Sequence, residues 1–415
     1  MVRYRWARQD DLEELLNLIG TGFTIRADAV HDRQQGKEHR ILFNYLYSRP
    51  TWQPDWVWVG EADGRLVVAV GVFPQQLYLG ETVVPVWAIS PVVTHPDFRG
   101  QGLGGECLLQ ALDRLKERGI AAVFLWGIPD FYPRYGFVPL LPRYKTRLRQ
   151  EQLRKETSGV QGHFRTVRET DLLQIAELYN RSNREFWLQP HRDLRWWHAR
   201  FAEMDIDQAI LKEVPYPIKE NFRVWENNNG ELAGYLYFQR DPLKLQVEVT
   251  ETGATDFQNA LAMVKNFIDH HGNDKQEVFF RGTPQHPLNM AAYRWGGTHV
   301  NPAPLAGMIK IINWPGFLQQ IASLIYSKFT LNHIENVSIP FHDPTLGKMV
   351  RISAGGIEVA NFADNAEMLN VTQMTRLLFG LYDRNDGALL KLGKMEMESL
   401  FPPRYPFIWD ANYLY

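Results

Sequence analysis

The stretch Val92-Val-Thr-His-Pro-Asp-Phe-Arg-Gly-Gln-Gly-Leu-Gly104 decides how the first third of this 415-residue chain folds. It opens on β-branched residues, which predict the end of a strand, and it leads into a pattern of helical periodicity. The glycines after Arg99 let the backbone bend and approach a ligand closely. The free N–H groups at the start of the helix then converge where the helix dipole favours an anion. The sequence therefore predicts a diphosphate cradle made of backbone amides.

Strand and helix patterns alternate on both sides of this loop. Tyr4 to Arg8 reads as a strand, and Asp10 is expected to cap a helix with Glu13 as its capping-box partner and Gly20 as its end. Asp63-Gly64 predicts a hairpin turn between two apolar strands. Further strands are expected over 77–79, 83–94 and 120–126. This order predicts an α/β (α+β) fold with a mixed sheet.

The chain repeats itself at an offset of 160 residues. Tyr4-Arg5, Arg8, Asp11-Leu12 and Arg134-Tyr135-Gly136 recur as Phe164-Arg165, Arg168, Asp171-Leu172 and Arg294-Trp295-Gly296. The constant offset predicts a duplicated domain, with 147–162 as a linker. From about Pro304 the pattern changes to a strand at 308–312, a helix at 318–326, two more strands and a helix at 372–379. The predicted domains are therefore 1–150, 160–303 and 304–415.

Composition narrows the classes of function. Lys plus Arg number 45 and Asp plus Glu 47, a formal net charge of −2, so no basic excess draws the chain to nucleic acid. The single cysteine, Cys107, excludes an intramolecular disulfide and a multi-cysteine zinc site, and no His, Asp and Glu set has metal-ligand spacing. No apolar run reaches the ~20 residues that cross a bilayer, and the start lacks a signal peptide. We expect a cytoplasmic protein without metal.

A second motif, Phe131-Tyr132-Pro-Arg-Tyr135-Gly136-Phe137, follows the strand expected at 120–126. Together with the glycine loop it resembles the GNAT superfamily of N-acetyltransferases. The resemblance implies acetyl-CoA as co-substrate and Tyr132 as the general acid, with Tyr135 as its competitor. A purely structural role for Tyr132, packing beside its phenylalanine neighbours, is the other interpretation. The implied acetyl-CoA contacts are Val92, Val93, Thr94, Arg99, Gly100, Gln101, Gly102, Leu103 and Gly104.

Over its full length the chain resembles the enhanced intracellular survival (Eis) acetyltransferases. The resemblance implies tandem GNAT-like domains, a smaller sterol-carrier-protein-like α/β domain and a homo-oligomer, a hexamer in that family. The central copy has Glu251-Thr-Gly-Ala-Thr-Asp in place of the loop and Ala292 at the position of Tyr132, so it should bind no acetyl-CoA. The family also implies that the terminal carboxylate, here on Tyr415, takes the proton of the amine. Alternatively, the aromatic tail only packs.

The sequence is therefore compatible with two functions. The first is acetyl transfer from acetyl-CoA to a primary amine of a small molecule or peptide. The second is non-catalytic binding of acyl-CoA or lipid through the carrier-like C-terminal domain. The penultimate residue is Leu414 rather than an acid, which argues against a polycationic substrate. Candidate rim residues of the substrate pocket are Trp87, Trp126, Asp28 and Asp32.

Overall fold

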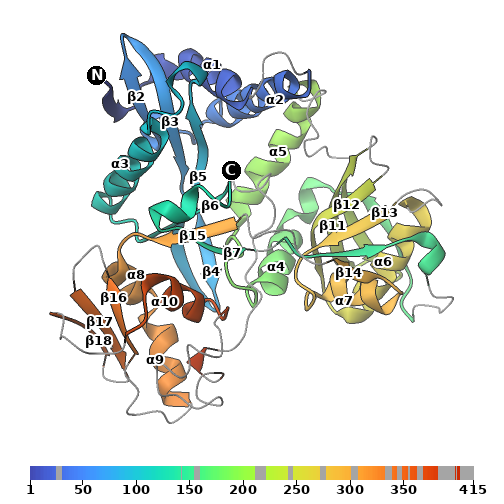
Figure 1. Ribbon diagram of the computed structural model, residues 1–415. Helices are drawn as coiled ribbons and strands as arrows, with labels where there is room; N and C mark the ends of the chain where they lie inside the picture. Colours follow the sequence, from blue (N-terminus) through green and yellow to red (C-terminus); the bar gives the residue numbers. More distant parts are fainter. Residues whose placement is uncertain are drawn as a thin grey trace.

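The computed structural model describes most of the chain, in three parts that Figure 1 shows at upper left, right and lower left. The described residues are 1–24, 30–141, 143–153, 159–210, 221–241, 246–271, 277–300, 307–331, 339–343, 348–353, 356–361, 368–381, 398 and 400–401. Tyr415 and Asp28, which the sequence singles out, lie outside them, as does the side chain of Asp32.

The first part is a mixed sheet with helices on both faces. Its strand order is β1 (Arg3–Trp6), β2 (Val57–Ala62), β3 (Arg65–Phe73), β5 (Thr82–Thr94), β6 (Ala122–Trp126), β15 (Gly307–Ile311) and β7 (Val138–Leu141), and β4 (Gln76–Leu79) pairs with β5. Alternate residues of β3 face opposite sides. Ala69 packs in one buried cluster with α1 (Leu12–Phe23) and α2 (Val30–Tyr47), and Val68 packs in another with α3 (Leu103–Glu117).

The second part repeats this layout. Its strand order is β9 (Gly162–Thr166), β10 (Phe222–Asn227), β11 (Leu232–Asp241), β12 (Gln246–Ala254), β13 (Glu277–Arg281), β8 (Lys145–Leu148) and β14 (Thr298–Val300). Its helices are α4 (Leu172–Asn183), α5 (Leu194–Ile210), α6 (Phe257–His271) and α7 (Pro287–Arg294). The hairpin that the sequence predicts at Asp63-Gly64 joins β2 to β3, and a second one, at Asn229-Gly230, joins β10 to β11.

The two sheets exchange one strand each. β8 follows the first copy along the chain, yet it lies between β13 and β14 of the second sheet. β15 follows the second copy, yet it lies between β6 and β7 of the first sheet, as Figure 1 shows. All four pairings are antiparallel. The sheets therefore cross the expected boundaries at 150 and 304, and the expected linker 147–162 begins inside β8.

The first and second parts, which are the two copies of the duplicated domain, each have an equivalent Arg–Asp ion pair near their start. Arg5 Nη1 lies 2.6 Å from Asp11 Oδ2, and Arg165 Nη1 lies 2.7 Å from Asp171 Oδ2. In the first copy the same Asp11 oxygen accepts the Arg8 N–H. The expectation that Asp10 caps the helix with Glu13 is therefore wrong, because a short 3-10 turn over Gln9–Asp11 precedes α1, and Asp11 stands at the N-cap of α1 with its carboxylate bonded to the start of the turn.

Two further helix boundaries differ from the sequence expectation. α1 continues past Gly20 to Phe23, and the Thr24 hydroxyl donates to the Gly20 carbonyl. The helix expected at 318–326 is two helices, α8 (Trp314–Gln320) and α9 (Ala322–Leu331), which meet at Ile321. Pro315 sits at the start of α8, where its missing N–H costs no hydrogen bond.

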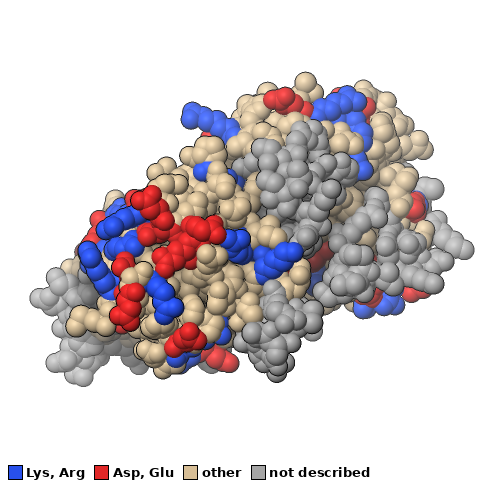
Figure 2. Space-filling model, turned by 90° about the horizontal axis from the view of Figure 1, so that it is seen from above, with Lys and Arg blue, Asp and Glu red and all other residues tan. Residues whose placement is uncertain are grey.

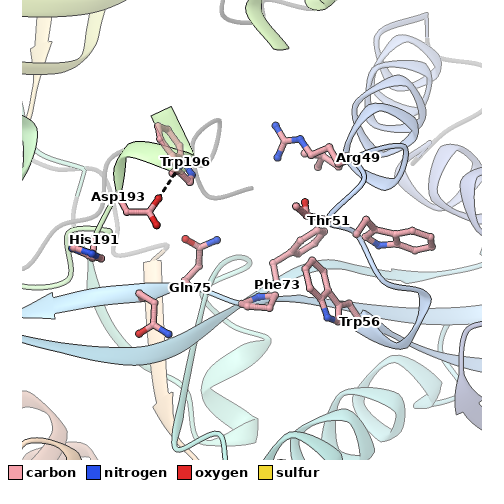
Figure 3. Close-up of a pocket in the computed structure, with 12 residues that line it drawn as sticks. Arg49, Thr51, Trp56, Phe73, Gln75, His191, Asp193 and Trp196 are labelled. Atoms are coloured by element: carbon pink, nitrogen blue, oxygen red, sulfur yellow. Dashed lines mark hydrogen bonds between the residues drawn. The ribbon is translucent and has the colours of Figure 1, made fainter. Parts of the chain in front are cut away.

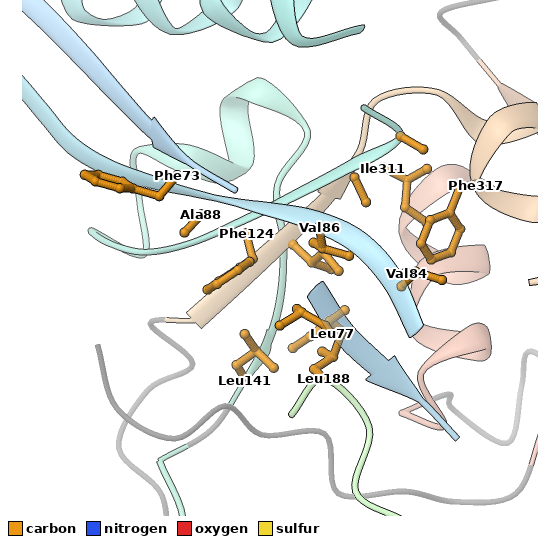
Figure 4. Close-up of a cluster of buried hydrophobic side chains, with 14 of the residues drawn as sticks. Phe73, Leu77, Val84, Val86, Ala88, Phe124, Leu141, Leu188, Ile311 and Phe317 are labelled. Carbon is orange, nitrogen blue, oxygen red and sulfur yellow. The ribbon is translucent and has the colours of Figure 1, made fainter. Parts of the chain in front are cut away.

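The third part is smaller. It contains the antiparallel strands β16 (Ile339–Asp343), β17 (Lys348–Ser353) and β18 (Gly356–Asn361), the helices α8 and α9, and α10 (Val371–Leu378). Its core is continuous with that of the first sheet, because Phe317 of α8 belongs to one buried cluster with Val84, Val86 and Ile311, as Figure 4 shows. Burial of these apolar side chains fixes the third part against the first.

The surface carries charges of both signs. Figure 2 shows acidic and basic side chains next to one another on the face seen from above. None of the helices in the described part of the chain is long and apolar enough to span a membrane.

Candidate active site

Strands β5 and β6 separate at the centre of the first sheet. They pair in parallel at only three positions, from Val86 with Ala122 to Ala88 with Phe124. β5 then continues to Thr94 with β3 on its other side. Over 89–94, one edge of β5 therefore has no partner strand among the described residues. Its free backbone groups can pair with an extended ligand, which fits the expectation for Val92, Val93 and Thr94.

The loop after β5 has the open backbone that the sequence predicts. Gly100 and Gly102 both adopt left-handed conformations, with φ of 75° and 80°, and α3 begins at Leu103. A Cβ atom placed on either glycine would meet no atom of the described residues within 4 Å. The loop is therefore open where an anion could approach the first amides of α3.

The Arg99 side chain is hydrogen-bonded to helix α1. Its Nη2 donates to the Gly22 carbonyl at 2.5 Å, near the C-terminal end of α1. The carbonyls at a helix C-terminus lack partners within the helix, so a guanidinium suits them. Arg99 thus ties the loop to α1, and its contact with a pyrophosphate stays a prediction.

Tyr132 lies in a short 3-10 turn, Tyr132–Tyr135, that follows β6. Its ring centroid lies 4.9 Å from that of Phe131 and 5.8 Å from that of Phe137, and a Cβ on Gly127 would lie 2.1 Å from the Tyr132 ring. The side chain is 8% exposed, and burial raises the pKa of its hydroxyl to about 12. Tyr132 therefore packs as the structural interpretation requires, and it also keeps its proton at neutral pH.

Tyr135 lies on the same turn but contacts another element. A Cβ placed on Gly105, in the first turns of α3, would lie 2.0 Å from the Tyr135 hydroxyl oxygen. Gly105 is therefore required by packing, whereas Gly100 and Gly102 are not. The Tyr132 turn and the helix that begins at the cradle are thus in direct contact.

A cavity of about 310 Å³ opens on the α2 side of the first sheet (Figure 3). Aromatic side chains make up much of its wall: Trp52, Trp56, Phe73 and Trp196. Polar side chains complete it: Arg49, Thr51, Gln75, Gln76, His191 and Asp193. Phe73 pairs with Ala88, the residue at which β5 leaves β6, so the cavity lies next to the separation of the two strands.

Sequence reasoning missed this cavity. Trp87 and Trp126, which the sequence suggests as rim residues, do not line it. Its walls come from three segments, 46–56, 73–76 and 191–196, and the last belongs to the second copy. The abundance of tryptophan, 13 in the chain, was the only available signal, and it does not say which of them meet.

Comparison with known proteins supports the sequence resemblance for the first part of the chain. Residues 3–140 match the family model described as an acetyltransferase (GNAT) domain. The uncharacterized N-acetyltransferase YjhQ of Escherichia coli (strain K12) is 34% identical over 119 residues, which cover 28% of this chain and 58% of that protein. The chain thus spans little more than half the length of this relative.

Solved structures resemble the whole chain in fold. A GCN5-related N-acetyltransferase from Anabaena variabilis has a TM-score of 0.71 at 13% identity, covering 99% of this chain and 100% of its own. Eis1 from Mycobacterium abscessus has a TM-score of 0.64 at 12% identity, with the same coverage. At these identities the likeness concerns the fold alone. Residues 3–140 thus match the GNAT acetyltransferase domain model, and the open glycine loop and the separated strands agree with that match.

Proposed function

We propose that the protein is an N-acetyltransferase that moves the acetyl group of acetyl-CoA onto a primary amine. One observation carries the proposal: within the part that matches a GNAT domain, no described strand pairs with one edge of β5 over 89–94, and this edge leads directly into the open loop at Gly100 and Gly102. The extended arm of acetyl-CoA would pair with the strand edge, and its diphosphate would accept from the amides at the start of α3.

The chemistry follows from what the thioester requires. The neutral amine nitrogen attacks the carbonyl carbon, and the C–S bond then breaks to give the acetamide and a thiolate. Tyr132 supplies a proton to the leaving sulfur, and its pKa of about 12 keeps the hydroxyl protonated until then. Tyr132 belongs to the same buried cluster as Ile89, the first residue of β5 beyond the separation, which supports this role.

The proton of the attacking amine needs an acceptor. The Eis resemblance suggests the terminal carboxylate of Tyr415, which lies outside the described residues. Adding one glycine after Tyr415 shifts the carboxylate by about 3.5 Å along an extended chain and keeps the ring. Turnover should fall while acetyl-CoA affinity is unchanged. Full activity of the extended protein would reduce the tail to a packing role.

The cavity beside Phe73 suits a small amine with an apolar or aromatic body. About 310 Å³ lies at the low end of ligand-site volumes, and four aromatic side chains line it. Of its described wall residues, Asp193 is the only acid, and Arg49 adds a positive charge. A polycation would meet too little negative charge here, which agrees with the expectation from Leu414.

The rival function, lipid binding by the C-terminal part, has less support. Among the residues described there, a cavity between Trp187, Ile325, Leu378 and Phe401 holds about 20 Å³, room for about one water molecule. The likeness to Eis1 in fold supports a full-length Eis-like architecture, including a carrier-like third domain, as part of the proposal.

Thiol release from acetyl-CoA in the presence of single primary amines tests the proposed function. We expect release that depends on the amine, with the acetylated product identified by mass spectrometry. Arylalkylamines should react faster than polyamines and aminoglycosides. If acetyl-CoA fails to bind, or if no amine raises thiol release above the background of hydrolysis, the proposed function is wrong.

A further inference from the structure

Strand β15 brings a lysine to the turn that carries Tyr132. Lys310 Nζ donates to the Tyr135 carbonyl at 2.5 Å, although the two residues are 175 positions apart. The Gly136 N–H closes the turn by donating to the Pro133 carbonyl at 3.0 Å, and the Phe137 N–H donates to the Tyr132 carbonyl at 3.4 Å. The Tyr135 carbonyl is the last of the turn and points outward to the lysine. Carbonyls at such ends require an outside donor.

The lysine is placed closely against the turn. Gly136 has a φ of 79°, and a Cβ at this position would lie 3.3 Å from Lys310 Nζ. Lys310 is half-buried, and burial lowers its pKa, with Asp113 of α3 acting in the opposite sense. A partly buried ammonium group loses hydration, and a specific hydrogen bond compensates for that loss.

The second sheet provides an internal comparison. In the first sheet, Lys310 of the exchanged strand β15 pairs with Val123 of β6. In the second sheet, Leu148 of the exchanged strand β8 pairs with Val278 of β13 and so takes the place of Lys310. Leu148 is fully buried in the core of the second copy. Strand exchange itself therefore works with leucine at this position, and lysine occurs in the copy that has the open cradle and Tyr132.

We propose that Lys310 is a positioning residue of the acetyl-transfer site: from the exchanged strand it holds the Tyr135 carbonyl and thereby fixes the turn that carries Tyr132. The inference rests on the proposed function. It makes the site of the first copy depend on a strand that follows the second copy along the chain. Tyr135 extends the effect, because its hydroxyl lies against Gly105 of α3.

Lys310→Leu is the decisive variant, since the protein itself uses leucine at the reciprocal position. With the full-length chain and the best amine acceptor, kcat should fall at least about tenfold, because geometry tolerances in catalysis are tight. The KM for acetyl-CoA should stay within about twofold, and Lys310→Arg, which keeps a cationic N–H donor, should recover most of kcat. Lys145→Leu removes a lysine from β8, the other exchanged strand, and should leave kcat unchanged.

Amide hydrogen exchange separates this inference from the proposed function, because it needs no substrate. Exchange at Gly136 and Phe137 should be at least about tenfold faster in Lys310→Leu than in the wild type. Wild-type kcat in folded Lys310→Leu, unchanged exchange, or a loss of kcat that only follows a falling Tm would each overturn the inference. A wild-type protein that acetylates no amine would instead count against the proposed function, while exchange would still show whether Lys310 holds the turn.

Discussion

Arg192 and Glu251 form a buried ion pair in the second copy, with Arg192 Nη1 2.6 Å from Glu251 Oε2 and both side chains 1% exposed. The guanidinium carbon lies 4.1 Å from the Trp196 ring centroid and 4.4 Å from that of Tyr179. The sequence places Glu251 in the loop of the second copy, but it stands within strand β12, two residues beyond Val249, the last residue that pairs with β13. This is the stretch that corresponds to the free edge of β5, so the pair fills the second copy where the first is open.

Glu251→Gln should therefore destabilise the second copy without weakening cofactor binding. The substitution leaves the buried guanidinium without its counter-charge, which costs about 3–5 kcal/mol of unfolding free energy. Chemical denaturation should show this loss, while the acetyl-CoA dissociation constant stays unchanged. Glu117→Gln is the control, since the Arg114–Glu117 pair has the same 2.6 Å distance but Glu117 is 60% exposed. It should cost less than about 1 kcal/mol. A large loss of acetyl-CoA affinity in Glu251→Gln would instead indicate that acetyl-CoA binds to the second copy.

Cofactor affinity should depend on the open side of the loop. A methyl group at Gly102 would stand where the diphosphate approaches, so Gly102→Ala should raise the acetyl-CoA dissociation constant at least about tenfold, roughly 1.4 kcal/mol. Gly119→Ala is a matched control at the other end of α3. Its φ is 81° against 80° for Gly102, and a Cβ there also meets nothing within 4 Å. The backbone strain is thus the same, and equal affinity loss in both variants, measured by calorimetry, would refute the cradle.

Tyr132→Phe keeps the ring that packs on Gly127 and removes only the hydroxyl. We expect kcat to fall by about 10²-fold with little change in acetyl-CoA affinity, as loss of a general acid predicts. Tyr135→Phe should cost much less. If steady-state kinetics show the reverse order, Tyr135 is the acid and Tyr132 is a packing residue.

The pH profile of kcat tests the same assignment without a mutation. A general acid works only while protonated, and burial raises the Tyr132 pKa from 10.0 to about 12. The acid is therefore lost only as pH rises through about 12. The rate should climb with pH as the amine loses its proton and should not fall anywhere below about pH 10. A fall in kcat between pH 8 and 9, with the protein still folded, would exclude Tyr132.

The sequence predicts local features well and long-range ones poorly. The Asp63-Gly64 turn and the loop before Leu103 are fixed by neighbours along the chain, so glycine positions and apolar patterns suffice to find them. The residues 308–312 read correctly as a strand, but strand propensity does not say which sheet a strand joins. The exchange of β15, and with it the contact of Lys310 with Tyr135, follows from tertiary packing. The sequence likewise does not reveal the cavity, because Phe73 and Asp193 come to line the same cavity only in the folded chain.

The last prediction concerns Asp193, the only acid among the described residues that line the cavity. Its Oδ1 also accepts the Trp196 N–H at 2.8 Å, at the start of α5 (Figure 3). Asn accepts the same hydrogen bond, so Asp193→Asn removes the charge and keeps the cap. If the cavity receives the cationic amine, the KM for the amine should rise by about tenfold, with kcat and the KM for acetyl-CoA unchanged.

Asp256→Asn supplies the matched control for this experiment. Asp256 Oδ1 accepts the Asn259 N–H at 2.8 Å at the start of α6, and it does not line the cavity. Both substitutions remove one negative charge from a helix N-terminus, so any general effect on stability should be shared. The rise in amine KM should appear in Asp193→Asn alone and should shrink at high ionic strength, because salt screens the attraction in wild type. Identical amine KM values in the two variants would mean that the amine reaches the thioester by another route.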